Sequence, residues 1–192
     1  MYKLCKTEQS AARQRELELK LAEQMNLCRY EEISVSDFCA FAGIPRKAFY
    51  RYFSNKDGAL YALLDHTMLD FELFRDPPEV TEKKGLHADL ESFFRFWRLH
   101  SQLLEALEHS GLSGVLMERA ISNVSAAAQE KKVLWIDNPR MRDHVIRFVV
   151  CGLMIMVISW HKEGYQESPQ QMAKLALKLI SEPLVPVMKN LF

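Results

Sequence analysis

The chain has 192 residues, and its 25 Lys and Arg residues balance 25 Asp and Glu residues, so its formal net charge is zero. This length can bury a core without disulfides or metal, and 48% hydrophobic with 26% charged residues argues against a disordered chain. Zero net charge removes a global positive field, the simplest argument for a nucleic-acid partner. Only seven Gly and seven Pro leave few residues for the turns of a sheet protein, so we expect an all-α fold.

The cysteines and apolar runs are those of a cytoplasmic protein. No C-x-x-C pair or zinc spacing is formed by the four cysteines, Cys5, Cys28, Cys39 and Cys151, and we expect reduced thiols and no metal. Residues 1–20 are polar and carry no secretory signal. The longest uncharged apolar run, 148–160, has 13 residues, whereas a membrane span needs ~20. We therefore expect this run to be a helix buried on more than one side, and no membrane partner.

The first two helices are predicted from local patterns. In the first, over about residues 9–28, the apolar residues Leu17, Leu21, Met25 and Cys28 recur on one helical face. The second begins at Ser34, because Ser34 to Asp37 has the pattern of a capping box, and Gly43 ends it as a residue free to adopt positive φ.

The third helix is expected from about Pro45 to Phe53, with Ile44 as its N-cap. Phe49 and Phe53 share its inward face, which directs Arg46, Lys47, Tyr50 and Arg51 outward. A second capping box, Ser54 to Asp57, predicts the start of a fourth helix that runs to about residue 74.

The only break in composition follows at Arg75 to Pro78, a helix stop. It suggests a small N-terminal domain, 1–55, a connecting helix, 55–75, and a larger C-terminal helical domain, 76–192. About nine helices are expected in all.

Two short helices joined by a tight turn, with a polar outer face on the second, are typical of a helix-turn-helix. Residues 43–56 contain four basic residues, two tyrosines and no acid, although the whole chain is neutral. Cations release counterions from DNA, and tyrosine hydroxyls donate to phosphate oxygens. The segment therefore predicts a double-stranded DNA partner.

The residues from Ile33 to Cys39 and from Ala42 to Leu60 resemble the DNA-binding domain of the TetR family of bacterial transcriptional repressors. The aromatic core Phe49-Tyr50-Arg51-Tyr52-Phe53, followed by Ser-x-Lys-Asp-x-x-Leu, is the strongest mark of the family. The resemblance implies an N-terminal helix-turn-helix domain and a C-terminal helical domain for ligand binding and dimerisation. It also implies a repressor that binds a palindromic operator as a homodimer and is released by a small-molecule effector.

The resemblance implies that the third helix reads the major groove. The expected DNA-binding residues are Ser34, Ser36, Arg46, Lys47, Ala48, Tyr50, Arg51, Tyr52 and Lys56. Two positions depart from the family: Pro45 stands where Ser or Thr usually caps the helix, and Lys47-Ala48 replaces a small residue followed by Thr. Both departures lie on the reading helix, so no operator sequence is transferred.

The C-terminal part also resembles one TetR subgroup, in which a Gly-containing apolar helix ends at Trp-x-x-x-Gly and the final helix opens with Ser-Pro. Here these features are Gly152, Trp160 to Gly164, and Ser168-Pro169, and Ser168 with Gln171 has the pattern of a capping box. In the family these helices pair across a two-fold axis. The expected dimer interface is Val150, Leu153, Val157, Trp160, Met172, Leu175 and Leu179.

Residues 80–138 are expected to supply the helices around a regulatory pocket. The candidate lining is Phe93, Phe94, Trp97, Leu104, Met117 and Trp135. Further candidates are Leu107 and the polar His100, His109 and Asn123. The alternative is plain core packing, because an aromatic stripe at helical spacing is core more often than pocket. The effector, the operator and the choice between repressor and activator are not fixed by the sequence.

Two other function classes compete with a DNA-binding regulator. An enzyme is not expected, because the chain has no G-x-S-x-G, P-loop, G-x-G-x-x-G or H-E-x-x-H motif, and no catalytic residue or cofactor is assigned. Glu105 and His109 could share a metal, but no third ligand has a suitable spacing. A helical interaction or ligand-binding protein that does not bind DNA remains the alternative.

Overall fold

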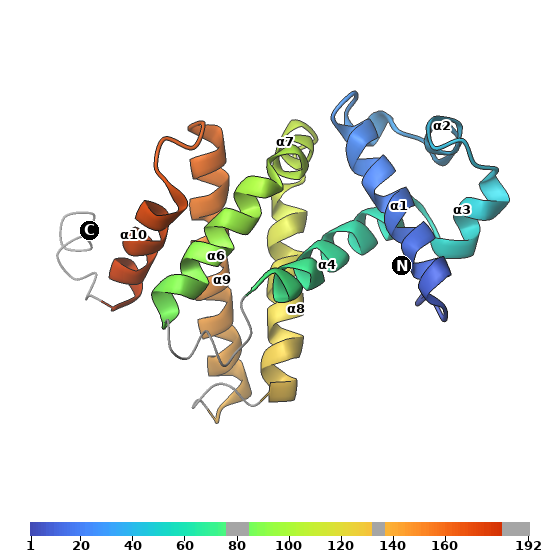
Figure 1. Ribbon diagram of the computed structural model, residues 1–192. Helices are drawn as coiled ribbons and strands as arrows, with labels where there is room; N and C mark the ends of the chain where they lie inside the picture. The colour runs from blue at the N-terminus through green and yellow to red at the C-terminus, as the bar shows by residue number, and fades with distance from the viewer. Residues whose placement is uncertain (76–84, 132–136, 182–192) are drawn as a thin grey trace. The chain divides into compact units, whose positions relative to one another are not determined.

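The computed structural model describes residues 1–75, 85–131 and 137–181, and these form nine α-helices and one short 3₁₀-helix (Figure 1). The first half contains α1 (Glu8–Met25), η1 (Tyr30–Glu32), α2 (Val35–Phe41), α3 (Arg46–Tyr52) and α4 (Lys56–Phe74). The second half contains α6 (Leu86–Leu99), α7 (Ser101–His109), α8 (Ser113–Lys131), α9 (Pro139–Lys162) and α10 (Pro169–Ser181). The all-α expectation is confirmed.

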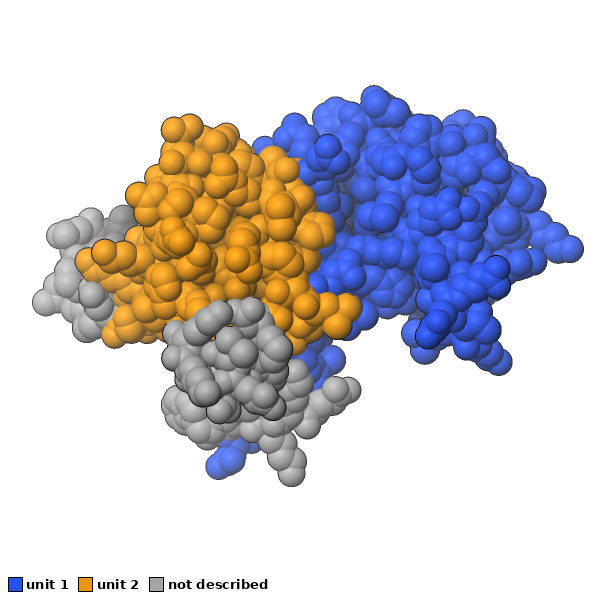
Figure 2. Space-filling model, in the orientation of Figure 1, with its two compact units in different colours: residues 1–70, 102–152 blue, residues 71–101, 153–192 orange. Residues whose placement is uncertain are grey.

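The helices belong to two compact units (Figure 2). Unit 1 consists of residues 1–70 and 102–152, and unit 2 consists of residues 71–101 and 153–192. Each unit therefore combines segments from both halves of the chain. The domain boundaries expected at residues 55 and 76 stay a prediction.

The core of unit 1 contains the apolar stripes expected for the first four helices. Leu17, Leu21 and Met25 of α1 are buried, and α1 ends at Met25, three residues before the expected end. Phe49 and Phe53 are also buried, and their ring centroids are 5.2 Å apart. This aromatic pair fixes which face of α3 points inward.

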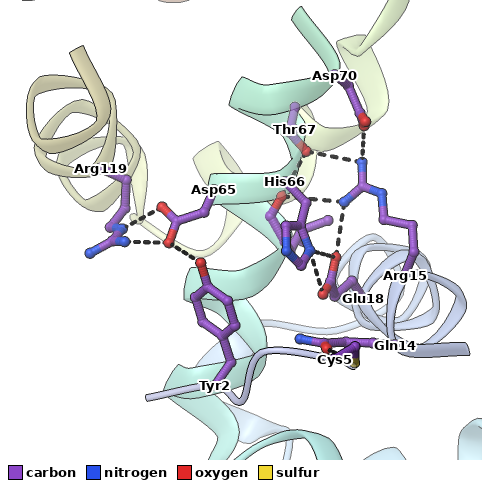
Figure 3. A network of polar contacts seen from close by, with 11 residues as sticks. Tyr2, Cys5, Gln14, Arg15, Glu18, Asp65, His66, Thr67, Asp70 and Arg119 are labelled. Atoms are coloured by element: carbon purple, nitrogen blue, oxygen red, sulfur yellow. Dashed lines mark hydrogen bonds and ion pairs between the residues drawn. The ribbon is translucent and has the colours of Figure 1, made fainter. Parts of the chain in front are cut away.

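Ion pairs and hydrogen bonds fasten α1 to α4 within unit 1 (Figure 3). The fully buried carboxylate of Glu18 accepts from Arg15 Nη1 at 3.1 Å and lies 2.9 Å from His66 Nδ1. Arg15 Nη2 also binds Asp70 Oδ2 at 2.5 Å. A buried charge is tolerated only when it is paired, so these partners make the position of α1 on α4 specific.

The core of unit 2 is aromatic. Phe94, Phe96 and Trp97 of α6 are almost wholly buried, and the ring of Phe94 meets that of Trp160 of α9 edge-on at 5.7 Å. Helix α10 packs on α6. It begins as expected, with Pro169 at its first position and a capping box in which Gln171 N donates to Ser168 Oγ at 3.2 Å and Ser168 N donates to Gln171 Oε1 at 2.7 Å.

Helix α9 contains the long apolar run. By length and composition alone it could cross a membrane, and one third of its most apolar stretch is buried inside the protein. Met154, Val157, Ile158 and Trp160 are buried, whereas Phe148 and Ile155 are exposed. Within the chain the helix thus has one packed side and one open side, so the expected burial on more than one side is not found here. The core helix of a soluble protein passes the same test of length and composition.

Candidate nucleic-acid interface

Helix α2 is held by the capping box expected from the sequence. Asp37 N donates to Ser34 Oγ at 3.1 Å, and Ser34 N donates to Asp37 Oδ2 at 3.1 Å. Hydrogen bonds from Ser34, chiefly those of its side chain, lower the pKa of the Asp37 carboxyl. Because Asp37 is engaged at the cap, its negative charge stabilises the N-terminus of α2. Ser36, the residue before it, remains exposed.

The turn between α2 and α3 depends on Gly43. This residue has φ +64°, and a Cβ placed on it would meet no atom within 4 Å, so glycine is needed for its backbone and not for space. Helix α3 then begins at Arg46 with Pro45 as N-cap, whose carbonyl accepts from Ala48 N at 2.8 Å. The expected N-cap at Ile44 is therefore wrong by one residue, since the proline φ of −71° suits the position before the helix.

The outer face of α3 is basic and aromatic. Arg46, Lys47, Tyr50 and Arg51 are exposed, as expected, and Ala48 is half-buried. Arg46 connects α3 to α2, because its Nη1 donates to Ser36 Oγ at 2.6 Å and its Nη2 donates to the Tyr50 hydroxyl at 3.2 Å. We call the exposed set Ser36, Arg46, Lys47, Tyr50 and Arg51 the reading face.

The hydroxyl of Tyr50 is oriented by this arrangement. It accepts from Arg46, whose guanidinium carbon lies 5.8 Å from the centroid of the ring, so its own proton is free to point to another acceptor. Phosphate oxygens are acceptors of the required kind. The geometry can therefore present a donor and a cation side by side.

Tyr52 lies on the other side of α3. Its side chain is only 8% exposed, against 40% for Tyr50, so it packs in the core of unit 1. Its role as a phosphate contact stays a prediction. The two-residue difference in helical position explains the contrast, because an i+2 step turns a side chain to the far side of the helix.

Lys56 is engaged inside the protein. Its Nζ donates to the carbonyl of Tyr30 at 2.6 Å and lies 4.1 Å from the centroid of the Tyr30 ring. Tyr30 in turn donates its hydroxyl to Asp57 Oδ1 at 2.7 Å, and burial, followed by this bond, raises the pKa of Tyr30. Lys56 therefore ties η1 to the start of α4, and its expected role in DNA binding stays a prediction.

The expected capping box from Ser54 to Asp57 is wrong. Asn55 caps α4 instead, because its Oδ1 accepts from Gly58 N at 2.8 Å, and Asp57 is taken by Tyr30. The sequence offered two adjacent residues that can cap a helix. The choice is made by Tyr30, which is 27 residues away in the chain.

The six residues expected around a ligand do not share one described cavity. Phe93, Phe94 and Trp97 lie on α6 in unit 2, Leu104 and Met117 lie on α7 and α8 in unit 1, and Trp135 lies outside the described residues. Phe94, Trp97 and Leu104 are buried as core.

A hollow of about 260 Å³ is found elsewhere, between α9 and α10. Its lining is Ile155, Met156, Ser159, Trp160, Glu163, Glu167, Met172 and Leu175. None of the six expected pocket residues belongs to it, and the ligand pocket stays a prediction. Among residues 1–75, 85–131 and 137–181, no group of three His, Cys, Asp or Glu side chains could hold a metal ion.

The residues expected at a dimer interface divide into two groups. Val150, Val157, Trp160 and Met172 are buried within the chain, Leu153 is half-buried, and Leu175 and Leu179 are exposed. Ile155 and Ile180, which the sequence analysis did not single out, are also exposed. We call Ile155, Leu175, Leu179 and Ile180, the exposed large apolar residues that α9 and α10 contribute to unit 2, the open apolar side.

Comparisons with known proteins agree with the fold. No curated protein matches the chain in sequence. A TetR-like transcriptional regulator from Rhodococcus sp. RHA1 has a similar structure, with 16% identity over 94% of this chain and 100% of that chain and a TM-score of 0.53. A tetR-family transcriptional regulator from Streptomyces coelicolor matches with 17% identity over 86% of this chain and 78% of that chain, at a TM-score of 0.53.

A third similar structure is titled as the dihydroxyacetone kinase operon activator DhaS, with 20% identity over 86% of this chain and 92% of that chain and a TM-score of 0.53. Identities this low show the fold. The family evidence is the match of residues 109–182 to the TetR_C_8 family, described as the transcriptional regulator C-terminal region. The match covers 74 of the 192 residues, so residues 109–182 resemble this family of regulators, and the chain as a whole has the fold of the solved TetR-type regulators.

Proposed function

We propose that this regulator acts in the cytoplasm, without catalysis, by binding a palindromic DNA operator as a homodimer, and that it represses transcription until a small-molecule effector releases it. The observation that carries the DNA contact is the reading face. Its three cations and Tyr50 are exposed together on α3, and no acidic residue occurs between residues 38 and 56. A neutral protein can thus present a local positive field where a phosphate backbone would lie.

The side chains of the reading face have different tasks in this proposal. Lys47 and Arg51 are one helical turn apart on α3 and are directed at the groove and its phosphates. Arg46 is held by Ser36 and Tyr50, so it loses less conformational freedom on binding than a free arginine would. Tyr50 donates its proton to a phosphate oxygen.

The salt dependence of binding tests this assignment. The operator is first selected from random duplexes with purified protein, and affinities are then measured from about 50 to 200 mM salt. Lys47→Ala and Arg51→Ala should each reduce the slope of log affinity against log salt by about 2, about 1 for each copy of the chain on the operator. Lys174→Ala, which removes an exposed lysine from α10, is the matched control and should leave the slope unchanged. An unaltered slope in both α3 variants would refute the reading face.

The proposed homodimer rests on the open apolar side of unit 2. Ile155 and Leu175 are 50% and 48% exposed, and both line the hollow between α9 and α10. A second copy of the chain is the proposed occupant, since two-fold pairing places two reading helices for a palindrome. A stable interface of ordinary size covers about 800 Å² per partner.

Charges placed on this side test the dimer. Ile155→Glu should yield a folded monomer in light scattering, because the substituted side chain points outward and the core is untouched. Leu19→Glu on α1, at 49% exposure, is the matched control and should remain dimeric. A charge at Val157 is not informative, because that side chain is fully buried and its loss would unfold the helix packing. A dimeric Ile155→Glu protein would contradict the proposed interface.

The direction of regulation and the effector are tested separately. A similar fold occurs in DhaS, an operon activator, so the fold alone does not decide between repression and activation. A reporter gene behind the selected operator should be less active when the protein is present, and a rise would identify an activator. Native mass spectrometry of the purified protein should reveal a bound small molecule, whose loss should raise operator affinity.

A further inference from the structure

Residues 1–3 pair with the end of the reading helix. Lys3 N donates to the carbonyl of Tyr52 at 2.9 Å, and Ser54 N donates to the carbonyl of Met1 at 3.1 Å, which makes an antiparallel bridge between Tyr2 and Phe53. These bonds join the segment to the residues that connect α3 to α4. We call residues 1–3 the strap.

Gly58 makes room for the strap. It lies in the first turn of α4, where a Cβ would overlap the carbonyl group of Met1, with the carbonyl carbon only 2.9 Å away. Gly58 has no positive φ, so the helix itself does not require glycine there. Glycine lowers helix stability relative to alanine, but at this position it allows Met1 to approach the helix closely enough for the strap to dock.

The strap also reaches a buried carboxylate that joins α4 to α8 (Figure 3). The hydroxyl of Tyr2 donates to Asp65 Oδ2 of α4 at 3.0 Å. The same buried carboxylate accepts from Arg119 Nε of α8 at 2.8 Å, from Arg119 Nη2, and from Asn123 Nδ2 at 2.9 Å. Burial, and then Asp65, raise the pKa of Tyr2 to about 12, so its hydroxyl keeps the proton that it donates.

Lys3 completes the contact with α3. Its Nζ donates to the carbonyl of Tyr50 at 2.8 Å, within the last turn of the helix. Carbonyls in the last turn lack helical partners and carry partial negative charge, so a cation there is favourable. The strap therefore binds the end of α3 by backbone and side chain, and binds Asp65 of α4 through Tyr2.

We propose that Tyr2 and Gly58 are positioning residues for DNA reading: they hold the strap between the end of α3 and the buried Asp65, and so fix the angle at which α3 presents the reading face. The inference rests on the proposed DNA contact. It assigns no DNA contact to the strap itself. Its effect is to restrict α3 to the one orientation that fits a groove, which lowers the cost of docking.

A double-mutant cycle, read by the melting temperature, tests docking of the strap without DNA. One change is Gly58→Ala, and the other is deletion of residues 2–5. In the full chain Gly58→Ala should lower the melting temperature, because the methyl group displaces Met1. In the deleted chain the same change should raise it by about 2–4 °C, because alanine is the better helix former. An equal effect of Gly58→Ala in both backgrounds would show that the strap does not dock.

The positioning role is tested with Tyr2→Phe, which keeps the ring that packs edge-on against His66 and removes only the hydroxyl. Operator affinity should fall by about 3- to 10-fold, the effect of one hydrogen bond. Affinity for a random duplex and the salt slope should remain unchanged, because every phosphate contact is retained. A loss of stability alone would lower the active fraction and leave the ratio of operator to random affinity unaltered.

The outcomes separate the two proposals. An unchanged affinity ratio in Tyr2→Phe overturns the positioning role while the DNA contact stands. Failure of the unmodified protein to bind any duplex overturns the proposed function and the positioning role with it. The Gly58 cycle still decides whether the strap is docked, because it needs no DNA.

Discussion

The ion pair between Asp65 and Arg119 should be the most sensitive charged contact of unit 1. Asp65 is buried, and its four donors come from Tyr2, Asn123 and the fork of Arg119. In Arg119→Met the carboxylate would keep only two neutral donors. Removing one partner of a buried pair costs about 3–5 kcal/mol, because the remaining charge is left without compensation.

Two features reduce this figure. The side chain of Arg119 is 29% exposed, so water already screens part of the pair, and Tyr2 and Asn123 stay in place. We therefore expect Arg119→Met to lower the free energy of unfolding by about 2–3 kcal/mol. For a chain of this size the melting temperature should fall by about 4–12 °C.

Urea unfolding followed by circular dichroism measures the effect. The matched control is Arg147→Met, which removes an exposed arginine that pairs with Asp143 one turn away on α9. Such surface pairs contribute about 0.3–0.5 kcal/mol. Equal losses in the two variants would mean that the Asp65 carboxylate is solvated and would refute the reasoning.

A second substitution tests whether the uncompensated charge on Asp65 causes the loss of stability. Asp65→Asn added to Arg119→Met removes the uncompensated charge and keeps the shape of the side chain. It should restore about 1–2 kcal/mol, since a neutral amide is less costly to bury than a carboxylate. A further loss of stability in the double variant would show that the charge on Asp65 is not the cause of the defect.

Three further outcomes are expected. Gly43→Ala should lower the free energy of unfolding by about 1–2 kcal/mol in urea, because a non-glycine residue is strained at its φ of +64°, although no atom obstructs a Cβ. Lys56→Met should lower it by about 1–3 kcal/mol through loss of the bond to the Tyr30 carbonyl and of the ring contact, and an unchanged salt slope of DNA binding would assign Lys56 to packing alone. The pKa of Tyr2 rises from 10.0 to about 12 on folding, so its contribution to stability is complete below pH 10 and is lost between about pH 10 and 12; Tyr2→Phe should therefore flatten the decline of the melting temperature over that interval.

Local signals explain which parts of the fold could be predicted. The caps at Ser34 and Ser168 need only a residue three positions later, and Gly43 ends α2 by its own backbone freedom. The cap at Asn55 was missed because a distant tyrosine occupies Asp57. The N-cap of α3 was missed by one residue for a local reason, the backbone of Pro45, whereas the cap of α4 was missed because a contact from outside the local segment chose between two adjacent residues.

The candidate site shows the same division. The outward set of α3 follows from helical spacing once Phe49 and Phe53 are placed inside. Helical spacing could also have placed Tyr52 and Tyr50 on different faces of α3. The residue types alone could not, because both are tyrosines within one aromatic run. Residues 148–160 of α9 are apolar all round, so nothing in their periodicity distinguishes buried Val157 from exposed Ile155.

The strap and the Asp65 pair had no sequence signal, because their partners are 63 and 54 residues apart. Their position nevertheless bears on the effector release proposed above. Helix α8 comes from the region that matches the regulator C-terminal family, yet it belongs to unit 1 together with α1, α2 and α3. Any effector that displaces α8 must break or carry along the bonds of Arg119 to Asp65, and Asp65 also holds the strap. A coupling of about 1–3 kcal/mol, the usual range between two ligand sites, is no larger than the cost expected for this one pair. The pair is therefore strong enough to transmit such a signal, and Asp65→Asn should weaken the link between effector and operator more than it weakens either binding event alone.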